Sequence, residues 1–350
     1  MKPKDKINMP ISKYVALAAI LVAIAPCGAD ALQYDIGKFS ARLTGYGTFG
    51  MIDPDFESPL SIGDWRVRGQ ATYEITEMQK FGLVYALDKA ATDKGNFTRE
   101  AFGFWEIKNT GRVEAGYTDS IARKLGVGLP DVGALRINDR PIYNEKIAPG
   151  GPIIADTTLT SGRIEGVRLN VVSAPNAGAQ YGVSVSGFST DYDYTVDAGI
   201  KIRRPSGKVK TAYSFGASFM NRPHDFDNEV YTPGVTADWR AQATAGMNLQ
   251  YNSWVWGLTT RVIYDQDPIG PVSDGIVAGT GVSYDLLKYS VSLTYMFSDT
   301  GIWNRDVADF QDHTAIASFR YKYSEYVDGW ISGGLTSRTP FISAGLRATF

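Results

Sequence analysis

The sequence predicts an all-β protein, a transmembrane antiparallel β-barrel of about sixteen strands. Three features carry this prediction: an export signal at the N-terminus, apolar residues at every second position, and connections that alternate between short and long. The 350 residues include 35 Lys+Arg and 37 Asp+Glu. Because nucleic acid binding needs a surplus of positive charge, this balance argues against nucleic acid as a partner. The single cysteine, Cys27, excludes a disulfide framework and a Cys-based zinc site.

Residues 1–31 have the pattern of a signal peptide. Four lysines in the first thirteen residues precede the apolar stretch Tyr14–Ala25. This stretch is shorter than the about 20 residues that a membrane-spanning helix needs. The small-x-small tripeptide that ends at Ala31 is typical of a signal-peptidase site. We therefore predict a mature chain of residues 32–350 without cysteine, with an N-terminal anchor helix as the alternative.

Alternation at period two is clearest in five segments. In Asp64–Glu74, Trp65 and Val67 share one face, whereas Arg66 and Arg68 lie on the other. The same pattern recurs in 236–249, 254–264, 289–297 and 342–350. Weaker candidates bring the count to sixteen strands: 38–52, 81–87, 97–107, 112–118, 161–173, 179–190, 192–203, 208–221, 275–285, 312–323 and 330–336.

The predicted connections alternate in length along the chain. The short ones are Thr76–Lys80, Asn109–Gly111, Pro175–Gly178, Arg204–Gly207, Gln250–Ser253, Asp285–Lys288 and Ser324–Gly329. The long ones are Asp53–Gly63, Asp88–Asn96, Asp119–Thr160, Arg222–Val235, Asp265–Asp274 and Thr300–Gln311. Short turns at one rim and long loops at the other are typical of bacterial outer-membrane barrels.

The chemistry of the two faces separates a membrane barrel from a soluble β-sandwich, which also alternates. Many apolar faces are aromatic and small, and the opposite faces carry Arg, Lys, Asp, Gln, Ser and Gly. In lipid every backbone polar group must be paired internally, so a closed barrel is the only β-structure that can span a membrane. A barrel of sixteen strands is too wide for side chains to fill, which accounts for the polar faces.

The last strand resembles the C-terminal assembly signal of outer-membrane barrels, in which apolar residues at every second position lead to a terminal aromatic residue. Here Ile342, Ala344 and Leu346 lead to Phe350, with Ala348 where that signal usually has an aromatic residue. The whole chain resembles the general diffusion porins of Gram-negative bacteria. This wider resemblance rests on FSARLTGYGTFG and GRVEAGYTDS, which span residues 39–50 and 111–120.

The resemblance implies a sixteen-stranded homotrimer in the outer membrane whose third long loop folds inward and narrows the pore. It also implies contacts with outer-membrane lipid, lipopolysaccharide and the barrel assembly machinery. Residues 119–160 form the longest predicted connection and occupy the place of that loop. They are the candidate constriction loop, although Gly126–Gly133 replaces the Pro-Glu-Phe-Gly-Gly turn common in the enterobacterial members.

Basic side chains on the water-facing side predict a charged constriction. Arg66 and Arg68 must face the lumen if Trp65 faces lipid, because adjacent side chains of a strand alternate. The opposite orientation is disfavoured, since a lipid-facing Arg at the midplane costs about 2–4 kcal/mol. Loop carboxylates opposite wall arginines would create a transverse field that orients polar solutes. The predicted constriction residues are Arg42, Arg66, Arg68, Asp119, Asp131, Asp139 and Glu145. The alternative is that these charges form local salt bridges that stiffen the wall.

Enzymatic motifs do not emerge from the sequence. The two histidines are His224, which lies beside Asp225 in a predicted loop, and His313 at the start of a predicted strand. A loop hydrolase built on His224 is one hypothesis, but no serine elbow or second ligand accompanies it. No phosphate-binding loop, zinc-protease motif or calcium loop occurs, so we predict no cofactor and no metal.

The predicted function is passive diffusion of small hydrophilic solutes and ions through a water-filled outer-membrane channel. One alternative is a substrate-selective channel, which a saturable current block by one solute class would reveal. Inward aromatic residues would favour sugars, and an inward ladder of Arg and Lys would favour anions. The other alternative is a non-conducting barrel that serves as an adhesin or structural anchor.

Overall fold

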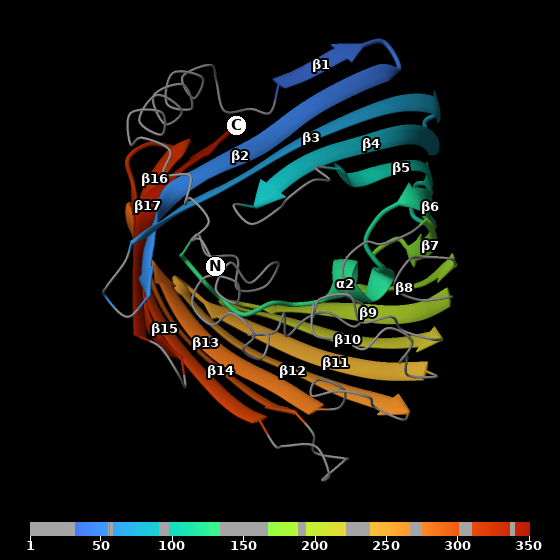
Figure 1. The fold of residues 1–350 in the computed structure, drawn as a ribbon. Helices are drawn as coiled ribbons and strands as arrows, with labels where there is room; N and C mark the ends of the chain where they lie inside the picture. The colour runs from blue at the N-terminus through green and yellow to red at the C-terminus, as the bar shows by residue number, and fades with distance from the viewer. Residues whose placement is uncertain are drawn as a thin grey trace, which may run out of the picture.

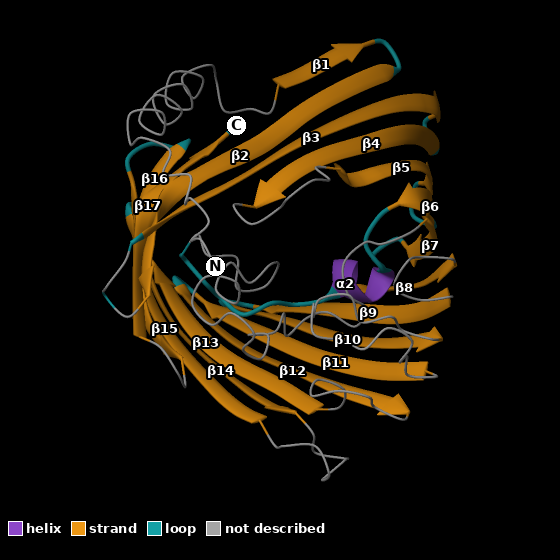
Figure 2. Ribbon diagram, in the orientation of Figure 1, coloured by secondary structure: helices purple, strands orange, loops and turns teal. Residues whose placement is uncertain are grey.

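The computed structural model describes most of the chain as antiparallel β-structure (Figures 1 and 2). The described residues are 32–54, 56, 59–90, 98–133, 167–187, 194–221, 239–266, 275–300, 310–336 and 340–350. Their elements are β1 (Leu32–Ile36), β2 (Phe39–Pro54), β3 (Leu60–Thr76), β4 (Gln79–Ala90), β5 (Thr98–Ile107), β6 (Gly111–Tyr117), α2 (Ile121–Leu125), β7 (Val167–Ser173), β8 (Ala179–Gly187), β9 (Tyr194–Ser206), β10 (Val209–Asn221), β11 (Trp239–Tyr251), β12 (Trp254–Gln266), β13 (Gly275–Asp285), β14 (Tyr289–Thr300), β15 (Phe310–Lys322), β16 (Val327–Thr336) and β17 (Pro340–Thr349).

Strands β2 to β17 form a closed barrel. Each strand pairs antiparallel with the next one along the chain, and β17 pairs with β2 to complete the ring. This arrangement confirms the predicted sixteen-stranded antiparallel barrel. Closure matters physically because it pairs the backbone groups of both edge strands, which would otherwise be exposed.

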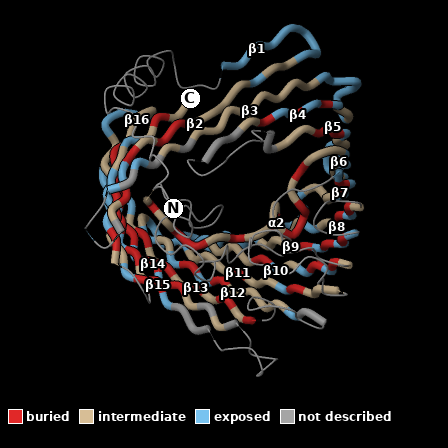
Figure 3. Tube along the Cα trace, in the orientation of Figure 1, coloured by how far each residue is buried: buried red, intermediate tan, exposed pale blue. Residues whose placement is uncertain are grey.

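The two faces of the wall alternate as the sequence predicts (Figure 3). On β14, Val291 and Leu293 are exposed on the outside, while Ser292 and Thr294 are buried on the inside. The same alternation holds on β4, where exposed Leu83 follows a glycine on the inner face. The outer surface is therefore mostly apolar, whereas polar side chains predominate on the inner wall, which also carries apolar ones such as Phe104, Ile316 and Trp330.

Aromatic side chains form two groups on the outer surface. Near the rim of long loops, Trp239 stacks with Phe219 at 5.9 Å between ring centroids and packs in a tilted arrangement against Tyr264 at 5.4 Å. Near the opposite rim, Trp254 lies 4.5 Å from Tyr284. Ten residues of β12 separate Trp254 from Tyr264, about 25 Å along the barrel axis for a strand tilted by about 40°.

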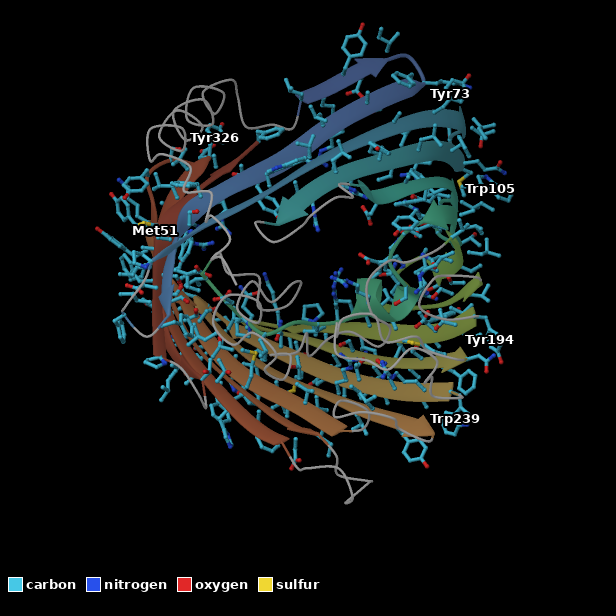
Figure 4. The ribbon with its side chains drawn as sticks, in the orientation of Figure 1. Met51, Tyr73, Trp105, Tyr194, Trp239 and Tyr326 are labelled. Atoms are coloured by element: carbon cyan, nitrogen blue, oxygen red, sulfur yellow. The ribbon has the colours of Figure 1, made fainter. Side chains whose placement is uncertain are left out.

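These two aromatic groups match the girdles that flank the apolar band of a membrane barrel. Figure 4 shows Tyr73, Trp105, Tyr194 and Trp239 projecting away from the barrel wall. The outer surface between the girdles is the part of the molecule suited to lipid contact. In the described part of the chain, no helix is long and apolar enough to cross a membrane.

Both ends of the predicted mature chain lie on one edge of β2. Strand β17 pairs with Tyr46–Pro54, and β1 pairs with Phe39–Leu43 further along the same edge. Between them, the Gly45 amide donates to the Phe350 carbonyl at 2.8 Å, and the Phe350 amide donates back at 3.0 Å. A Cβ on Gly45 would lie 2.6 Å from the Arg66 carbonyl oxygen, so this position requires glycine.

Two differences from the predicted strand boundaries concern β1 to β3. The predicted loop Asp53–Gly63 is shorter in the structure, because β2 and β3 extend to the pair formed by Ile52 and Leu60. Strand β1 was not predicted. Its five residues are exposed and gain their strand conformation by pairing with the part of β2 that β17 does not reach, which is a tertiary effect.

Candidate functional site in the barrel interior

The inner wall is rich in hydroxyl groups. Buried Ser and Thr side chains recur on one strand after another around the ring. They include Ser184, Ser186, Thr195, Ser214, Ser218, Thr259, Ser283, Ser290, Ser292, Thr294, Thr314, Ser318, Ser332 and Ser343. Short hydroxyl side chains leave space inside the barrel and offer donors and acceptors to whatever occupies it.

The chain turns into the barrel directly after β6. Ser120 caps helix α2, because its hydroxyl accepts a hydrogen bond from the Arg123 amide at 3.3 Å. The helix ends at Gly126 after little more than one turn, and its contacts are with β7 to β10. Figure 1 shows α2 inside the ring of strands. Residues 126–133 continue along the inner wall toward β14 and β16.

Inward-facing glycines provide a seat for this segment. A Cβ on Gly257 of β12 would lie 2.4 Å from Cδ of Pro130, and a Cβ on Gly246 of β11 would lie 2.7 Å from the Val127 carbonyl. Contacts of the same kind involve Gly182, Gly199, Gly279 and Gly281. The loop can lie this close to the wall because these positions have no side chain.

Wall hydroxyls fix the backbone of the same segment. The Val127 amide donates to Ser214 at 2.9 Å, and the Thr294 hydroxyl donates to the Pro130 carbonyl at 3.2 Å. Two further bonds of this kind join the Ile121 amide to Ser184 and the Val132 amide to Ser292, each at 3.2 Å. Because these side chains bond to the backbone, they hold the loop largely independently of its own side chains.

A charged cluster anchors the start of the loop to the wall. Glu114 of β6 pairs with Lys124 of α2 and with Arg112, whose Nε lies 3.0 Å from Glu114 Oε1. Asn170 of β7 also donates to Glu114 at 3.0 Å. Lys124 donates to Thr118 as well, at 2.6 Å. A glutamate that is almost fully buried is thus compensated by two cations and an amide.

A second buried ion pair lies beside this cluster. Arg168 of β7 and Asp197 of β9 are 1% and 0% exposed, and Arg168 Nη1 lies 2.8 Å from Asp197 Oδ2. The Ser184 hydroxyl donates to the same carboxylate oxygen at 3.1 Å. These three residues tie β7, β8 and β9 together next to α2.

The predicted wall arginines all lie on β2 and β3. Arg42 and Arg68 occupy inward positions, and their register partners are Gln70 and Thr44, respectively. Arg66 shares this face, two residues from Arg68. Arg68 pairs with Glu100 of β5, with 3.3 Å between Nε and Oε2.

The predicted loop carboxylates lie elsewhere along the wall. Asp119 pairs with Arg123 at 3.5 Å, at the start of α2. Asp131 is buried against β14, where it accepts hydrogen bonds from the Gly133 amide at 2.9 Å and from Ser292 at 3.5 Å. Asp139 and Glu145 lie outside the described residues, as does the part of the predicted loop from 134 to 160.

Burial raises the pKa of Asp131 to about 6. The Gly133 amide, Ser292 and the positive charges of Arg347 and Arg320 lower the pKa but only partly compensate for burial. This carboxyl group therefore takes up a proton in mildly acidic solution, where its desolvation cost disappears.

The sequence analysis did not single out the residues that seat the loop. Two inward glutamates were missed: Glu114 anchors the loop through Lys124, and Glu100 pairs with Arg68, and both lie in strands that were predicted only weakly. Strand alternation could have placed them inside, but it gives no information about which strands the loop crosses. The inward glycines carried a weaker signal, since glycine also serves turns and close strand packing.

The closed ring, its two aromatic girdles and its polar interior define a transmembrane β-barrel of the outer-membrane type. Its structure is similar to a loop-deletion mutant of OmpT, an outer membrane protein of Vibrio cholerae, with a TM-score of 0.66, 12% identity, and coverage of 90% of this chain and 100% of that one. Salmonella typhi OmpF gives a TM-score of 0.66 at 10% identity, covering 91% and 100%.

An anion-selective porin from Comamonas acidovorans gives a TM-score of 0.59 at 13% identity, covering 89% of this chain and 100% of that one. No family model and no curated protein matches the sequence. The chain therefore has the porin fold, a multi-pass barrel of outer-membrane type. Within the described residues, no group of three or more His, Cys, Asp or Glu could hold a metal ion.

Proposed function

We propose that this protein is a water-filled outer-membrane channel for the passive diffusion of small hydrophilic solutes and ions. The observation that carries the proposal is the polar inner wall of a ring of sixteen strands. A barrel of this size leaves an interior that side chains cannot fill, and small hydroxyl residues line it here. The segment from Ile121 to Gly133 lies along one side of that interior.

The proposed constriction lies between this loop and the opposite wall. Arg42, Arg66 and Arg68 supply positive charge on β2 and β3, while Asp119 belongs to the loop side. Asp131 lies on the loop side as well, and Asp139 and Glu145 remain proposed members of the same set. Because Arg68 pairs with Glu100, part of the wall charge is neutralised locally. The transverse field would then depend less on Arg68 than on Arg42.

Processing after Ala31 is part of the proposal. The small-x-small tripeptide that ends at Ala31 supports it. The outward positions of Ile342, Ala344 and Leu346 on β17 support their proposed role in recognition by the barrel assembly machinery. N-terminal sequencing of the protein purified from outer membranes checks the cleavage site.

We further propose a homotrimer embedded in outer-membrane lipid and lipopolysaccharide, without enzymatic activity. A trimer form is described for Vibrio cholerae OmpT, whose structure resembles this one with a TM-score of 0.64. The hydrolase hypothesis rests on His224, which lies outside the described residues. Electrophoresis of the detergent-solubilised protein with and without heating checks the oligomeric state, because a folded trimer should migrate as a larger species before heating.

Planar-bilayer recording of the purified protein in potassium chloride tests the channel directly. We expect stepwise current increases with a conductance that rises in proportion to salt, because ions cross a water-filled path. Liposomes that contain the protein should swell in small sugars faster than in large ones. Correctly folded barrels that carry no current would contradict the proposal and support the anchor alternative.

A further inference from the structure

Most described charges on the inner wall are neutralised by an opposite charge. The pairs are Arg68 with Glu100, Lys80 with Glu106, Arg112 and Lys124 with Glu114, Arg168 with Asp197, Arg320 with Asp285, and Arg347 with Asp328. Ion pairing is thus the usual way in which this wall accommodates a basic side chain. It limits the field that these residues project into the lumen.

Three cations on β9 and β10 depart from this rule. Lys201, Arg203 and Lys210 face the lumen, and no carboxylate in the described part of the chain pairs with any of them. The next acidic residue on this face of β9 is Asp197, and it is already bound to Arg168. We name Lys201, Arg203 and Lys210 the basic patch.

The register of the strands brings the three side chains together. Lys201 and Arg203 are neighbours on one face of β9, about 7 Å apart. Lys210 lies diagonally across from Arg203, because Arg203 pairs with Ala212, at the about 7–8 Å typical of such neighbours. Long basic side chains at these spacings can converge on a single anion.

The surroundings of the basic patch are neutral and can donate hydrogen bonds. Gln180 of β8 pairs in register with Lys201. On the other side, Gln250 of β11 pairs with Lys210, and Asn248 pairs with Ala212. Amide groups therefore flank the cations on both neighbouring strands and could complete the coordination of an oxyanion.

The basic patch is accessible to solvent. Arg203 and Lys210 are exposed, and Lys201 is half-buried. The Lys201 ammonium donates to the Gly126 carbonyl at 3.5 Å, so the loop passes directly beside the patch. The turn at Gly207 follows closely, which places the patch at the mouth with short turns, the periplasmic mouth in barrels of this type.

We propose that the basic patch of Lys201, Arg203 and Lys210 is a binding site for small multivalent oxyanions at the periplasmic mouth of the channel. This inference rests on the proposed channel function and adds a solute class to it. The three positive charges repel one another, and a bound oxyanion would offset that repulsion. Phosphate-bearing and carboxylate-bearing solutes share the chemistry that the patch recognises.

The test uses inorganic pyrophosphate as a blocker of single channels in a planar bilayer, with wild type and a triple variant, Lys201→Gln, Arg203→Gln and Lys210→Gln. Wild type should pass chloride better than potassium. Pyrophosphate should block it at lower concentration from the short-turn side. In the triple variant the half-blocking concentration should rise about tenfold or more, and chloride preference should fall.

The control variant removes the same charge from turns of the same rim, with Lys38→Gln, Lys108→Gln and Lys288→Gln. Pyrophosphate should block the control variant at the same half-blocking concentration as wild type. Equal half-blocking concentrations for wild type and the triple variant would overturn the proposed binding site. An equal rise of this concentration in the control variant and the triple variant would also overturn it, because it would indicate a diffuse electrostatic field. Absence of any current in wild type would instead overturn the channel function itself.

Discussion

Replacing residues 118–166 with a two-residue Asn-Gly turn should raise single-channel conductance about twofold or more. Tyr117 and Val167 are register partners, so a tight turn can join β6 to β7 without changing the barrel. The replacement removes α2 and the segment that lies on the inward glycines. The water-filled cross-section then widens, and both conductance and the size limit for sugars increase.

A matched variant controls for the shortening itself. Asn221 and Trp239 are also register partners, so the same turn can replace residues 222–238 between β10 and β11. We expect a conductance close to that of wild type, because the proposed constriction does not include this connection. If the variant without residues 118–166 folds and conducts as wild type does, the loop does not limit the flow of ions.

The Asp197→Ala variant should lose about 3–5 kcal/mol of its free energy of unfolding. This substitution removes the buried Asp197 carboxylate, which pairs with the Arg168 guanidinium and accepts a hydrogen bond from the Ser184 hydroxyl. Urea unfolding in detergent micelles, followed by tryptophan fluorescence, measures the loss. A double variant, Arg168→Met with Asp197→Leu, should recover part of it because neither of these two positions then holds a buried charge.

Glu106→Ala is the matched control for this prediction. The pair of Lys80 and Glu106 has comparable geometry, at 2.9 Å, but its side chains are 41% and 31% exposed. Solvent screens such a pair, so its loss should cost about 0–1 kcal/mol. Equal stability of the Asp197→Ala and Glu106→Ala variants would show that the buried pair contributes no more than the exposed one.

Strand alternation made most of this fold predictable. A one-residue shift would turn every lipid-facing side chain of a strand into the lumen, so the pattern around Trp65 or Leu293 admits one orientation. The closure of β17 on β2 followed from the need to pair every backbone group in lipid. Strand β1 could not be predicted in this way, because its residues become a strand only where β2 offers an unpaired edge.

The candidate site was less predictable than the wall. The sequence indicated that Arg66 and Arg68 face the interior, since lipid excludes them, and the structure places both on the inner face of β3. It could not indicate that Asp131 lies against Ser292, because that contact joins residues far apart in the chain. Seating of the loop on Gly246 and Gly257 likewise depends on the path of the chain through the barrel rather than on local pattern.

Thiol labelling of two adjacent positions on β11 tests the central claim most directly. The proposed mature chain, residues 32–350, contains no cysteine, so Thr244→Cys and Ala243→Cys each introduce a single thiol. Thr244 faces the lumen, and Ala243 faces outward near the middle of the strand. A charged, membrane-impermeant thiol reagent should modify Thr244→Cys rapidly and reduce its current, and leave Ala243→Cys in the lipid-embedded barrel unmodified. Rapid modification of Ala243→Cys with protection of Thr244→Cys would contradict a water-filled interior.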